Sequence, residues 1–167
     1  IVTGSNGLLG SFFCEHILSL GACVYGFDRD KNLNSIENPS FKFLQVDITN
    51  SLDIEKARDT INQKYGRIDV IINNAAINDS VEGEKLDLDN SRFENFPLEL
   101  WEKSLDVNLT GPFLICQIML ELLEKSSSAS IINISSTYGL VAPDQDIYRD
   151  FENRQFFFKG PAYSTTK

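Results

Sequence analysis

The stretch IVTGSNGLLG at residues 1–10 sets a short apolar run against a glycine pattern spaced G-x-x-G-x-x-G, and it decides the fold. From Leu8 to Leu20 apolar residues recur at helical spacing, and Gly21 ends the pattern. A glycine turn between a strand and a helix presents backbone N–H groups and the positive end of the helix dipole to an anion. The stretch therefore predicts a dinucleotide-phosphate loop. The alternative is a plain glycine turn.

Strand and helix patterns alternate along the rest of the chain. Strands are expected at 22–28, 41–47, 68–75 and 130–136. Helices are expected from Asn50 or Ser51 to Tyr65 with Gly66 as the stop, over about 98–125 with a break at Gly111-Pro112, and from Pro161 onward. This alternation predicts an α/β fold: a Rossmann-type, doubly wound parallel sheet in three αβα layers.

The two ends of the chain interrupt that pattern. The first strand is very short, and the final helix has hardly begun when the sequence ends. We therefore expect residues 1–167 to be a fragment of a longer protein, truncated at both ends. Those residues should form one NAD(P)-binding Rossmann domain.

Composition excludes several classes of function. The chain has 167 residues, 42% of them hydrophobic, and a net charge of −9, which argues against nucleic-acid binding because phosphate contacts need a basic face. The apolar segment 109–123 contains Gln117 and Glu121, so no membrane span is expected. Three scattered cysteines and the absence of a signal peptide indicate buried thiols and a cytoplasmic location. His16 has no second ligand nearby, so no metal site is expected.

Asp28 follows Gly10 by eighteen residues, at the end of a predicted strand. A carboxylate at this spacing accepts hydrogen bonds from the ribose hydroxyls of NAD and repels the 2′-phosphate of NADP. Arg29 weakens the preference because a guanidinium suits a phosphate. NAD is therefore the expected cofactor and NADP stays possible. A strand-end turn residue is the alternative interpretation of Asp28.

Six motifs occur in an order that resembles the short-chain dehydrogenase/reductase family: TGSNGLLG (3–10), VDIT (46–49), NNAA (73–76), VNLTG (107–111), NISS (133–136) and YSTTK (163–167). The resemblance implies hydride transfer between a nicotinamide and an alcohol or ketone carbon. It implies a catalytic tetrad of Asn108, Ser136, Tyr163 and Lys167. With the loop and Asp28 it implies cofactor binding by Gly4, Ser5, Asn6, Gly7, Leu8, Gly10, Asp28, Arg29, Asp47, Ile48, Asn74, Ala75, Ala76, Tyr163 and Lys167, with Asn73 supporting that site from its strand end.

Elementary chemistry agrees with the roles that the resemblance implies. An ordinary tyrosine has a pKa of about 10, and a nearby ammonium favours the phenolate. Tyr163 alone among the five tyrosines has a lysine four residues later, on the same helical face. Ser136 follows a strand end and can hydrogen-bond a substrate oxygen; neighbouring Ser135 should point to the opposite side. By resemblance, Asn108 holds a water of the proton relay.

Three departures from the family pattern bear on the substrate. The glycine spacing resembles the extended branch, which contains nucleotide-sugar epimerases and dehydratases, whereas NNAA and NISS resemble the common oxidoreductases. The segments 77–101 and 137–162 are longer than usual and leave the carboxyl edge of the sheet, so they either line a pocket or cover the surface. SRFENF and YGLVAPDQDIY resemble oxidoreductases of flagellin and surface-glycan modification.

These observations predict a small-molecule substrate that is sugar-like. Two alternatives stay open: an epimerase or dehydratase with tightly bound NAD, and a non-catalytic dinucleotide-binding regulator. The family resemblance also implies a homo-oligomer for the full-length protein. The apolar residues that could partly face a partner subunit, although most are expected in the core, are Phe113, Leu114, Ile118, Leu122 and Leu123.

Overall fold

Five parallel strands form one sheet in the computed structural model, which describes residues 1–31, 36–78 and 87–167. The strands are β1 (Val2–Thr3), β2 (Val24–Asp28), β3 (Phe41–Gln45), β4 (Val70–Asn73) and β5 (Ser130–Asn133). Their order is β3-β2-β1-β4-β5. The chain therefore builds outward from β1 in one direction and then continues on its other side, which creates the switch point where doubly wound sheets bind ligands. The predicted fold class is confirmed.

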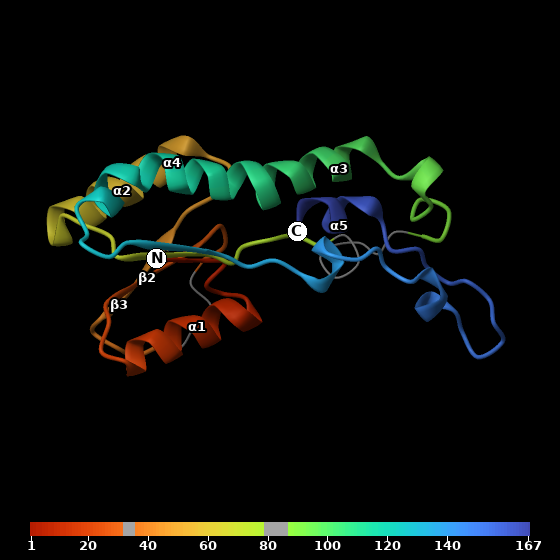
Figure 1. The fold of residues 1–167 in the computed structure, drawn as a ribbon, viewed down its shortest axis with the longest axis horizontal. Coiled ribbons are helices and arrows are strands. Elements are labelled where there is room, and N and C mark those ends of the chain that lie inside the picture. Colours follow the sequence, from red (N-terminus) through yellow and green to blue (C-terminus); the bar gives the residue numbers. More distant parts are fainter. Residues whose placement is uncertain (32–35, 79–86) are drawn as a thin grey trace. The chain divides into compact units, whose positions relative to one another are not determined.

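Helices cover both faces of this sheet (Figure 1). Helix α1 (Leu8–Ser19) lies on one face, and α2 (Ser51–Tyr65) and α4 (Gly111–Glu124) lie together on the other. The core under α1 consists of Val2, Cys14, Leu18, Val24 and Ile72. Strands that are covered on both sides need apolar residues in succession, which explains the runs that the sequence shows.

Helix α2 begins and ends where its sequence signals stand. The Asn50 side chain accepts a hydrogen bond from the Leu52 amide at 3.0 Å, which caps the first turn. Gly66 has φ 67° and ends the last turn in the left-handed conformation that glycine favours. Both predicted boundaries of this helix are confirmed.

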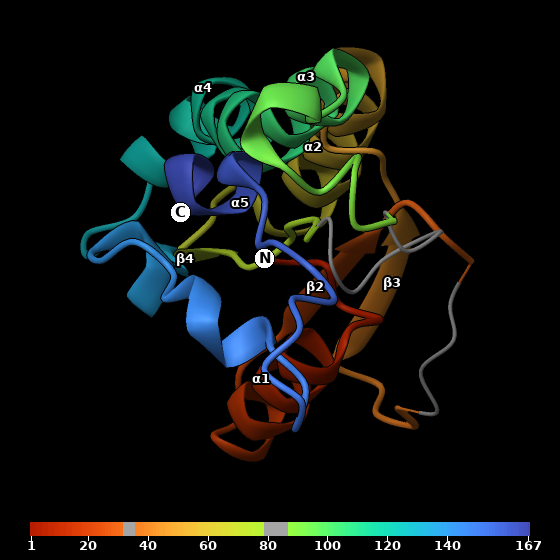
Figure 2. The same cartoon turned by 90° about the vertical axis from the view of Figure 1, so that its right-hand side faces the viewer.

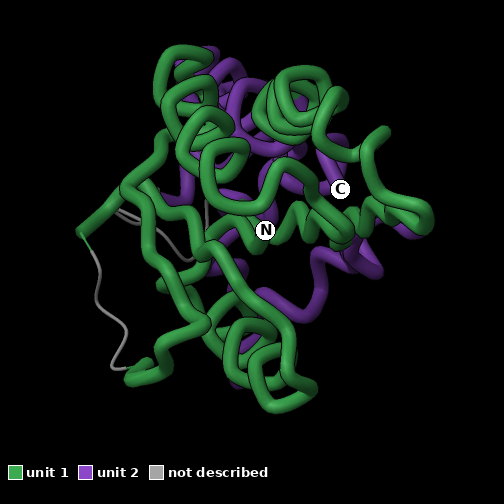
Figure 3. The backbone as a smooth tube through the Cα atoms, turned by 90° about the vertical axis from the view of Figure 1, so that its left-hand side faces the viewer, with its two compact units in different colours: residues 1–75, 110–134 green, residues 76–109, 135–167 purple. Residues whose placement is uncertain are grey.

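The described residues divide into two units (Figure 3). Unit 1 comprises residues 1–75 and 110–134 and contains the whole sheet with α1, α2 and α4. Unit 2 comprises residues 76–109 and 135–167. Its elements are the 3-10 turn η1 (Phe93–Asn95), helix α3 (Leu98–Leu105), most of the π-helical turn η2 (Asp106–Thr110), the 3-10 turns η3 (Thr137–Gly139) and η4 (Gln145–Tyr148), and helix α5 (Pro161–Thr166).

Several boundaries differ from those predicted. Strands β2 to β5 are two to four residues shorter than the predicted strands. The break in the long helix lies in η2, before the predicted Gly111-Pro112 site, and Pro112 occupies the first turn of α4 without disturbing it.

The expectation that the cysteines are buried needs correction. Cys14 is buried as predicted, and burial raises the pKa of its thiol to about 11, but Cys23 is exposed because it precedes β2 at the sheet end. Leu122 and Leu123 are buried in the core, whereas Phe113 is 59% exposed on the outer side of α4.

The helical run Leu98–Glu124 is long and apolar enough, by length and composition, to cross a membrane. Core helices of globular proteins meet the same criterion. Here α4 buries Ile115, Met119, Leu122 and Leu123, and it packs against α2, β4 and β5. These four apolar residues of α4 therefore belong to the core of unit 1, whereas Phe113 and Leu120 are exposed.

Candidate functional site

The glycine loop after β1 is shaped by two close approaches. Gly4 has φ 66°, and a Cβ atom on it would come within 2.9 Å of the Ala75 Cα. A Cβ on Gly10 would collide with the backbone carbonyl of Gly4 and come within 2.9 Å of the Ser5 Cα. The Gly7 amide donates to the Gly4 carbonyl at 3.1 Å and closes the turn. Larger residues at positions 4 and 10 would force this loop apart.

The loop places the first turn of α1 at the carboxyl edge of the sheet. Gly7 is the N-cap of α1 and offers no side chain to the first amides of the helix. Leu8, which follows it, is 88% exposed. Amides that start a twelve-residue helix and receive no side-chain cap form a natural binding site for a pyrophosphate.

Asp28 lies beside this loop. Its Oδ2 accepts a hydrogen bond from the Asn6 amide at 2.9 Å, and its Oδ1 accepts one from the Asp30 amide at 3.2 Å. The carboxylate thus fixes the loop and keeps further lone pairs for the hydroxyls of a ribose. Arg29 is exposed and lies 3.8 Å from Asp30. Its guanidinium therefore lies near the Asp30 carboxylate and is also solvated.

The turn after β3 carries Asp47 and Ile48. One carboxylate oxygen of Asp47 accepts from the Thr49 amide at 2.9 Å and from the Thr49 hydroxyl at 2.7 Å. Ile48 is 7% exposed. These contacts fix the conformation of the turn, and the predicted place of Asp47 and Ile48 around the adenine stays a prediction.

Asn74 and Ala75 are bound to β1 through one residue that the sequence analysis did not single out. The Thr3 hydroxyl oxygen accepts hydrogen bonds from the Asn74 and Ala75 amides, each at 3.0 Å. The Asn74 side chain donates to the carbonyls of Thr3 at 2.9 Å and Gly4 at 3.3 Å. The threonine in VTG was the available signal. Ala76, the last predicted residue of this group, belongs to unit 2.

Tyr163 and Lys167 lie on and just after α5, which packs against α3 and η3 within unit 2 (Figure 2). Gly160 is the N-cap and Pro161 the first residue of α5, so the helix starts where the sequence predicts. Tyr163 is half-buried. Burial lowers the pKa of the Lys167 ammonium below its ordinary value.

Asn108 is buried inside the π-helical turn η2 and makes three side-chain hydrogen bonds. Its Oδ1 accepts from the Ile77 amide at 2.8 Å, and its Nδ2 donates to the Ile77 carbonyl at 3.1 Å and to the Thr166 hydroxyl at 2.8 Å. One amide therefore joins the segment after β4 to α5. Single π turns inside helices occur frequently at functional sites. The predicted water-holding role of Asn108 stays a prediction.

Ser135 and Ser136 make different contacts. The Ser135 hydroxyl donates to the Lys167 carbonyl at 2.7 Å, whereas the Ser136 oxygen accepts from the Tyr138 amide at 3.2 Å. An accepting serine oxygen keeps its hydrogen for donation to a substrate. A Cβ on Gly139 would collide with the Lys167 backbone, so glycine is needed where η3 meets the end of α5. Gly139 is a second residue that the sequence analysis missed.

The two units thus hold different halves of the predicted site. Unit 1 contains the predicted cofactor residues up to Ala75, and unit 2 brings the elements with Asn108, Ser136, Tyr163 and Lys167 together. Residues 79–86 of the first long segment lie outside the described residues. Within the part of the chain that the structure describes, His, Cys, Asp and Glu form no group of three able to hold a metal ion.

Comparisons with known proteins agree with the fold described above. The NAD-dependent glycerol dehydrogenase of Listeria innocua is 30% identical over 151 residues, which are 88% of this chain and 56% of that protein. A crystal structure of a short chain dehydrogenase from Leptospira borgpetersenii with bound NAD⁺ matches with a TM-score of 0.80 and 28% identity, over 98% of this chain and 57% of that one. Ligand-free aldohexose dehydrogenase of Thermoplasma acidophilum has the same fold, with a TM-score of 0.76 and 22% identity, over 99% of this chain and 54% of that one.

The chain spans about half the length of the curated relatives it matches. The sequence profile described as short chain dehydrogenase matches residues 1–148, which include the glycine loop, Asp28, Asn108 and Ser136. This match covers most of the chain, and the chain belongs to the short-chain dehydrogenase family.

Proposed function

We propose that the full-length protein is an NAD-dependent oxidoreductase that transfers a hydride between the nicotinamide and an alcohol or ketone carbon. The observation that carries this proposal is the assembly in unit 2. Asn108 bonds to α5 through Thr166, and α5 packs against the turn that follows Ser136. Four residues from three separate stretches of sequence are thereby held by one set of contacts.

The residues of unit 1 fit NAD. Gly10 leaves a cradle that a Cβ atom would fill, α1 starts without a side-chain cap, and Asp28 offers carboxylate lone pairs to a ribose. The crystal structure from Leptospira borgpetersenii holds NAD⁺, and the relative from Listeria innocua is NAD-dependent. NADP is disfavoured because its 2′-phosphate would approach the Asp28 carboxylate.

When bound, the nicotinamide supplies the hydride acceptor or donor. Ser136 donates its hydroxyl hydrogen to the substrate oxygen and orients it. Tyr163 moves the proton to or from that oxygen as the general acid or base. Lys167 binds the nicotinamide ribose and stabilises the tyrosinate as a cation. Because burial lowers the pKa of Lys167, turnover should fall on the alkaline side at a lower pH than an ordinary lysine would impose.

For the substrate we propose a polyol or a sugar-like molecule. A glycerol dehydrogenase among the relatives supports a polyhydroxylated substrate. The resemblance of SRFENF and YGLVAPDQDIY to enzymes of surface-glycan modification favours a sugar or sugar nucleotide. A cytoplasmic location, a homo-oligomeric assembly and a role in surface-glycan synthesis belong to the same proposal.

A substrate screen of the full-length protein tests the proposal. NAD and NADP are each paired with glycerol, simple sugars and sugar nucleotides, and reduced cofactor is followed by its absorbance. We expect turnover with NAD, and Tyr163→Phe should lower it by about a thousandfold. Tyr65→Phe, in unit 1, is the matched control and should keep full turnover. Unchanged turnover in Tyr163→Phe would refute the tyrosine mechanism.

The glycine spacing favours one second candidate, an epimerase or dehydratase that keeps its NAD. Cofactor that stays bound through purification, together with sugar-nucleotide conversion and no net reduced cofactor, would identify it. Cofactor binding without any conversion would instead identify a regulator.

A further inference from the structure

A second lysine lies beside Tyr163. Lys159 is only 5% exposed, and its Nζ is positioned over the Tyr163 ring, 4.8 Å from the centroid. Ammonium groups are rarely buried to this degree, because partners must replace the hydration that they lose. A methionine or leucine would fill the same space at lower cost. The burial therefore points to a use for the charge.

The ammonium and the backbone of Lys159 are both fixed. The Nζ donates a hydrogen bond to the Asn78 side-chain oxygen. The Lys159 amide donates to the Gln145 Oε1 at 2.9 Å, and its carbonyl accepts from the Gln145 Nε2 at 3.1 Å. These two hydrogen bonds to one amide side chain fix the Lys159 backbone, as the paired hydrogen bonds between two β-strands fix a residue in a sheet.

Both long segments contribute to this support. From the first, Asn78 holds the ammonium and the buried Ser91 hydroxyl accepts from the Phe158 amide at 3.1 Å. From the second, Gln145 holds the backbone, and the Gln155 side chain donates to the Gln145 carbonyl at 2.9 Å. The segments therefore converge on the residues immediately before α5.

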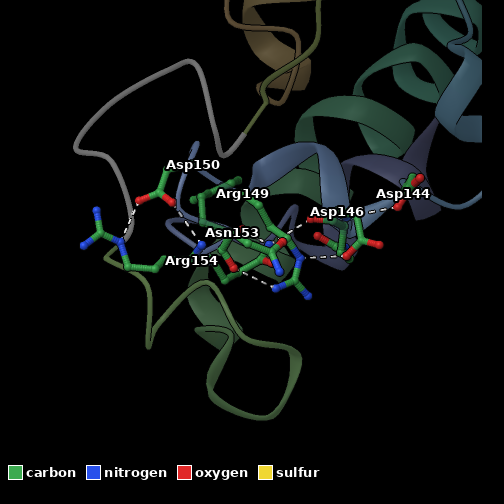
Figure 4. Close-up of polar contacts among 9 residues, drawn as sticks. Asp144, Asp146, Arg149, Asp150, Asn153 and Arg154 are labelled. Atoms are coloured by element: carbon green, nitrogen blue, oxygen red, sulfur yellow. Dashed lines mark hydrogen bonds and ion pairs between the residues drawn. The ribbon is translucent and has the colours of Figure 1, made fainter.

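The rest of the second segment is internally bonded (Figure 4). Arg149 bonds to Asp146 at 2.8 Å, and Arg154 bonds to Asp150 at 2.8 Å. The Asp144 carboxylate accepts from the Asp146 amide at 3.0 Å, which caps η4. Exposed ion pairs are individually weak, but together these contacts fix the turn that carries Gln145.

We propose that Lys159 is a positioning residue for Tyr163, and that the two long segments exist to place its ammonium against the tyrosine ring. A cation on the ring face is attracted to the ring quadrupole, more strongly where water is excluded. The contact thus restrains the ring while its hydroxyl stays free for proton transfer. This inference rests on the proposed function of Tyr163.

Nuclear magnetic resonance of the full-length protein tests the contact without any substrate. The Tyr163 ring signals are assigned by their loss in Tyr163→Phe. We expect an Overhauser effect between the Lys159 ε-protons and the Tyr163 ring protons in the folded wild-type protein. Its absence would overturn the proposal. This arm needs no variant of Lys159, so a variant that fails to fold does not weaken it.

Substitutions then test the role. Lys159→Met should shift and broaden the Tyr163 ring signals, and Lys159→Arg should restore them. The matched control is Lys64→Met, which removes a second lysine–tyrosine contact of 5.4 Å at Tyr65, in unit 1. It should alter the Tyr65 signals only. Tyr163 signals that are unchanged in folded Lys159→Met would contradict the proposal.

Kinetics with NAD and glycerol as probes separate positioning from binding. Lys159→Met should lower kcat about tenfold with KM for glycerol within about twofold, and Lys159→Arg should recover most of kcat. A rise in KM alone, or no change in kcat, would overturn the positioning role. If glycerol is not turned over by the wild type, the resonance experiments decide. Failure of the proposed function would appear separately, as unchanged turnover in Tyr163→Phe.

Discussion

Units 1 and 2 differ in the groups that they position and in the contacts that hold those groups. Unit 1 places backbone groups: parallel ladders, the capped helix α2 and a glycine turn hold amides at the sheet edge. Unit 2 places side chains, and it does so on a six-residue helix, a π turn and two long segments. Backbone periodicity suffices for the first task. The second depends on single hydrogen bonds between residues far apart in sequence, so unit 2 is where one substitution should change function most selectively.

Gly10→Ala should have the largest effect and should fall on unit 1. The added methyl group meets the Gly4 carbonyl, so the loop and the start of α1 must separate. We expect a loss of about 3 kcal/mol in the free energy of unfolding, measured in urea, and loss of NAD binding by titration. Ser11→Ala changes the next residue and should cost less than about 0.5 kcal/mol. Normal NAD binding in Gly10→Ala would show that the close approach is unimportant.

Gly139→Ala applies the same change to unit 2. Its methyl group would push away the backbone of Lys167 and displace the end of α5. We expect turnover to fall about a hundredfold, as misplacement of about 1 Å can cost, with a smaller loss of NAD affinity because Lys167 is also the proposed ribose ligand. Leu140→Ala is the control, since that side chain is 87% exposed. Unchanged turnover in Gly139→Ala would show that the close approach to Lys167 is unimportant.

Asn108→Ala should have the next largest effect, which is to destabilise unit 2. It removes three hydrogen bonds and leaves the Ile77 backbone groups and the Thr166 hydroxyl to find other partners. We expect the free energy of unfolding, measured by heat or urea, to fall by about 2 kcal/mol. Thr166→Val removes the Asn108 bond to α5 together with the bonds from the Thr166 hydroxyl to the Ala162 and Tyr163 carbonyls, and it should cost about 1 kcal/mol. Wild-type stability in Asn108→Ala would show that its three bonds do not hold unit 2 together.

Ser126→Ala should have the smallest effect and lies in unit 1. The Ser126 hydroxyl, bonded at 2.7 Å, lowers the pKa of Asp69, and Arg67 adds to this. The carboxylate therefore stabilises the fold fully above the ordinary aspartate pKa of about 4, and this contribution disappears as the pH falls through the lowered native value.

In Ser126→Ala we expect the free energy of unfolding at pH 7 to fall by about 0.5 kcal/mol. The loss is small because the Asp69 carboxylate is exposed. The difference from wild type should shrink as the pH falls toward 3. Urea unfolding at several pH values measures it, and a difference independent of pH would contradict the assignment to Asp69.

Most of unit 1 could be predicted from the sequence. The spacing of apolar residues fixed α1 and α2 to within a residue, and Asn50 and Gly66 marked the ends of α2. The strand ends were less accurate, because an apolar run does not show where the ladder bonds stop. The predicted cofactor residues stay predictions, although Asp28 and Asn74 each bond to the glycine loop.

The sequence by itself determined the class of fold, because periodicity is a local property, and its resemblance to a known family named the four residues proposed for catalysis. Only the tertiary structure revealed Thr3, Gly139 and Lys159, since their contacts with Asn74, Lys167 and Asn78 join distant parts of the chain. Lys159 stands four residues before Tyr163, yet nothing local distinguishes it from a solvated lysine. Its burial depends on Asn78 and Gln145, which folding alone brings to it.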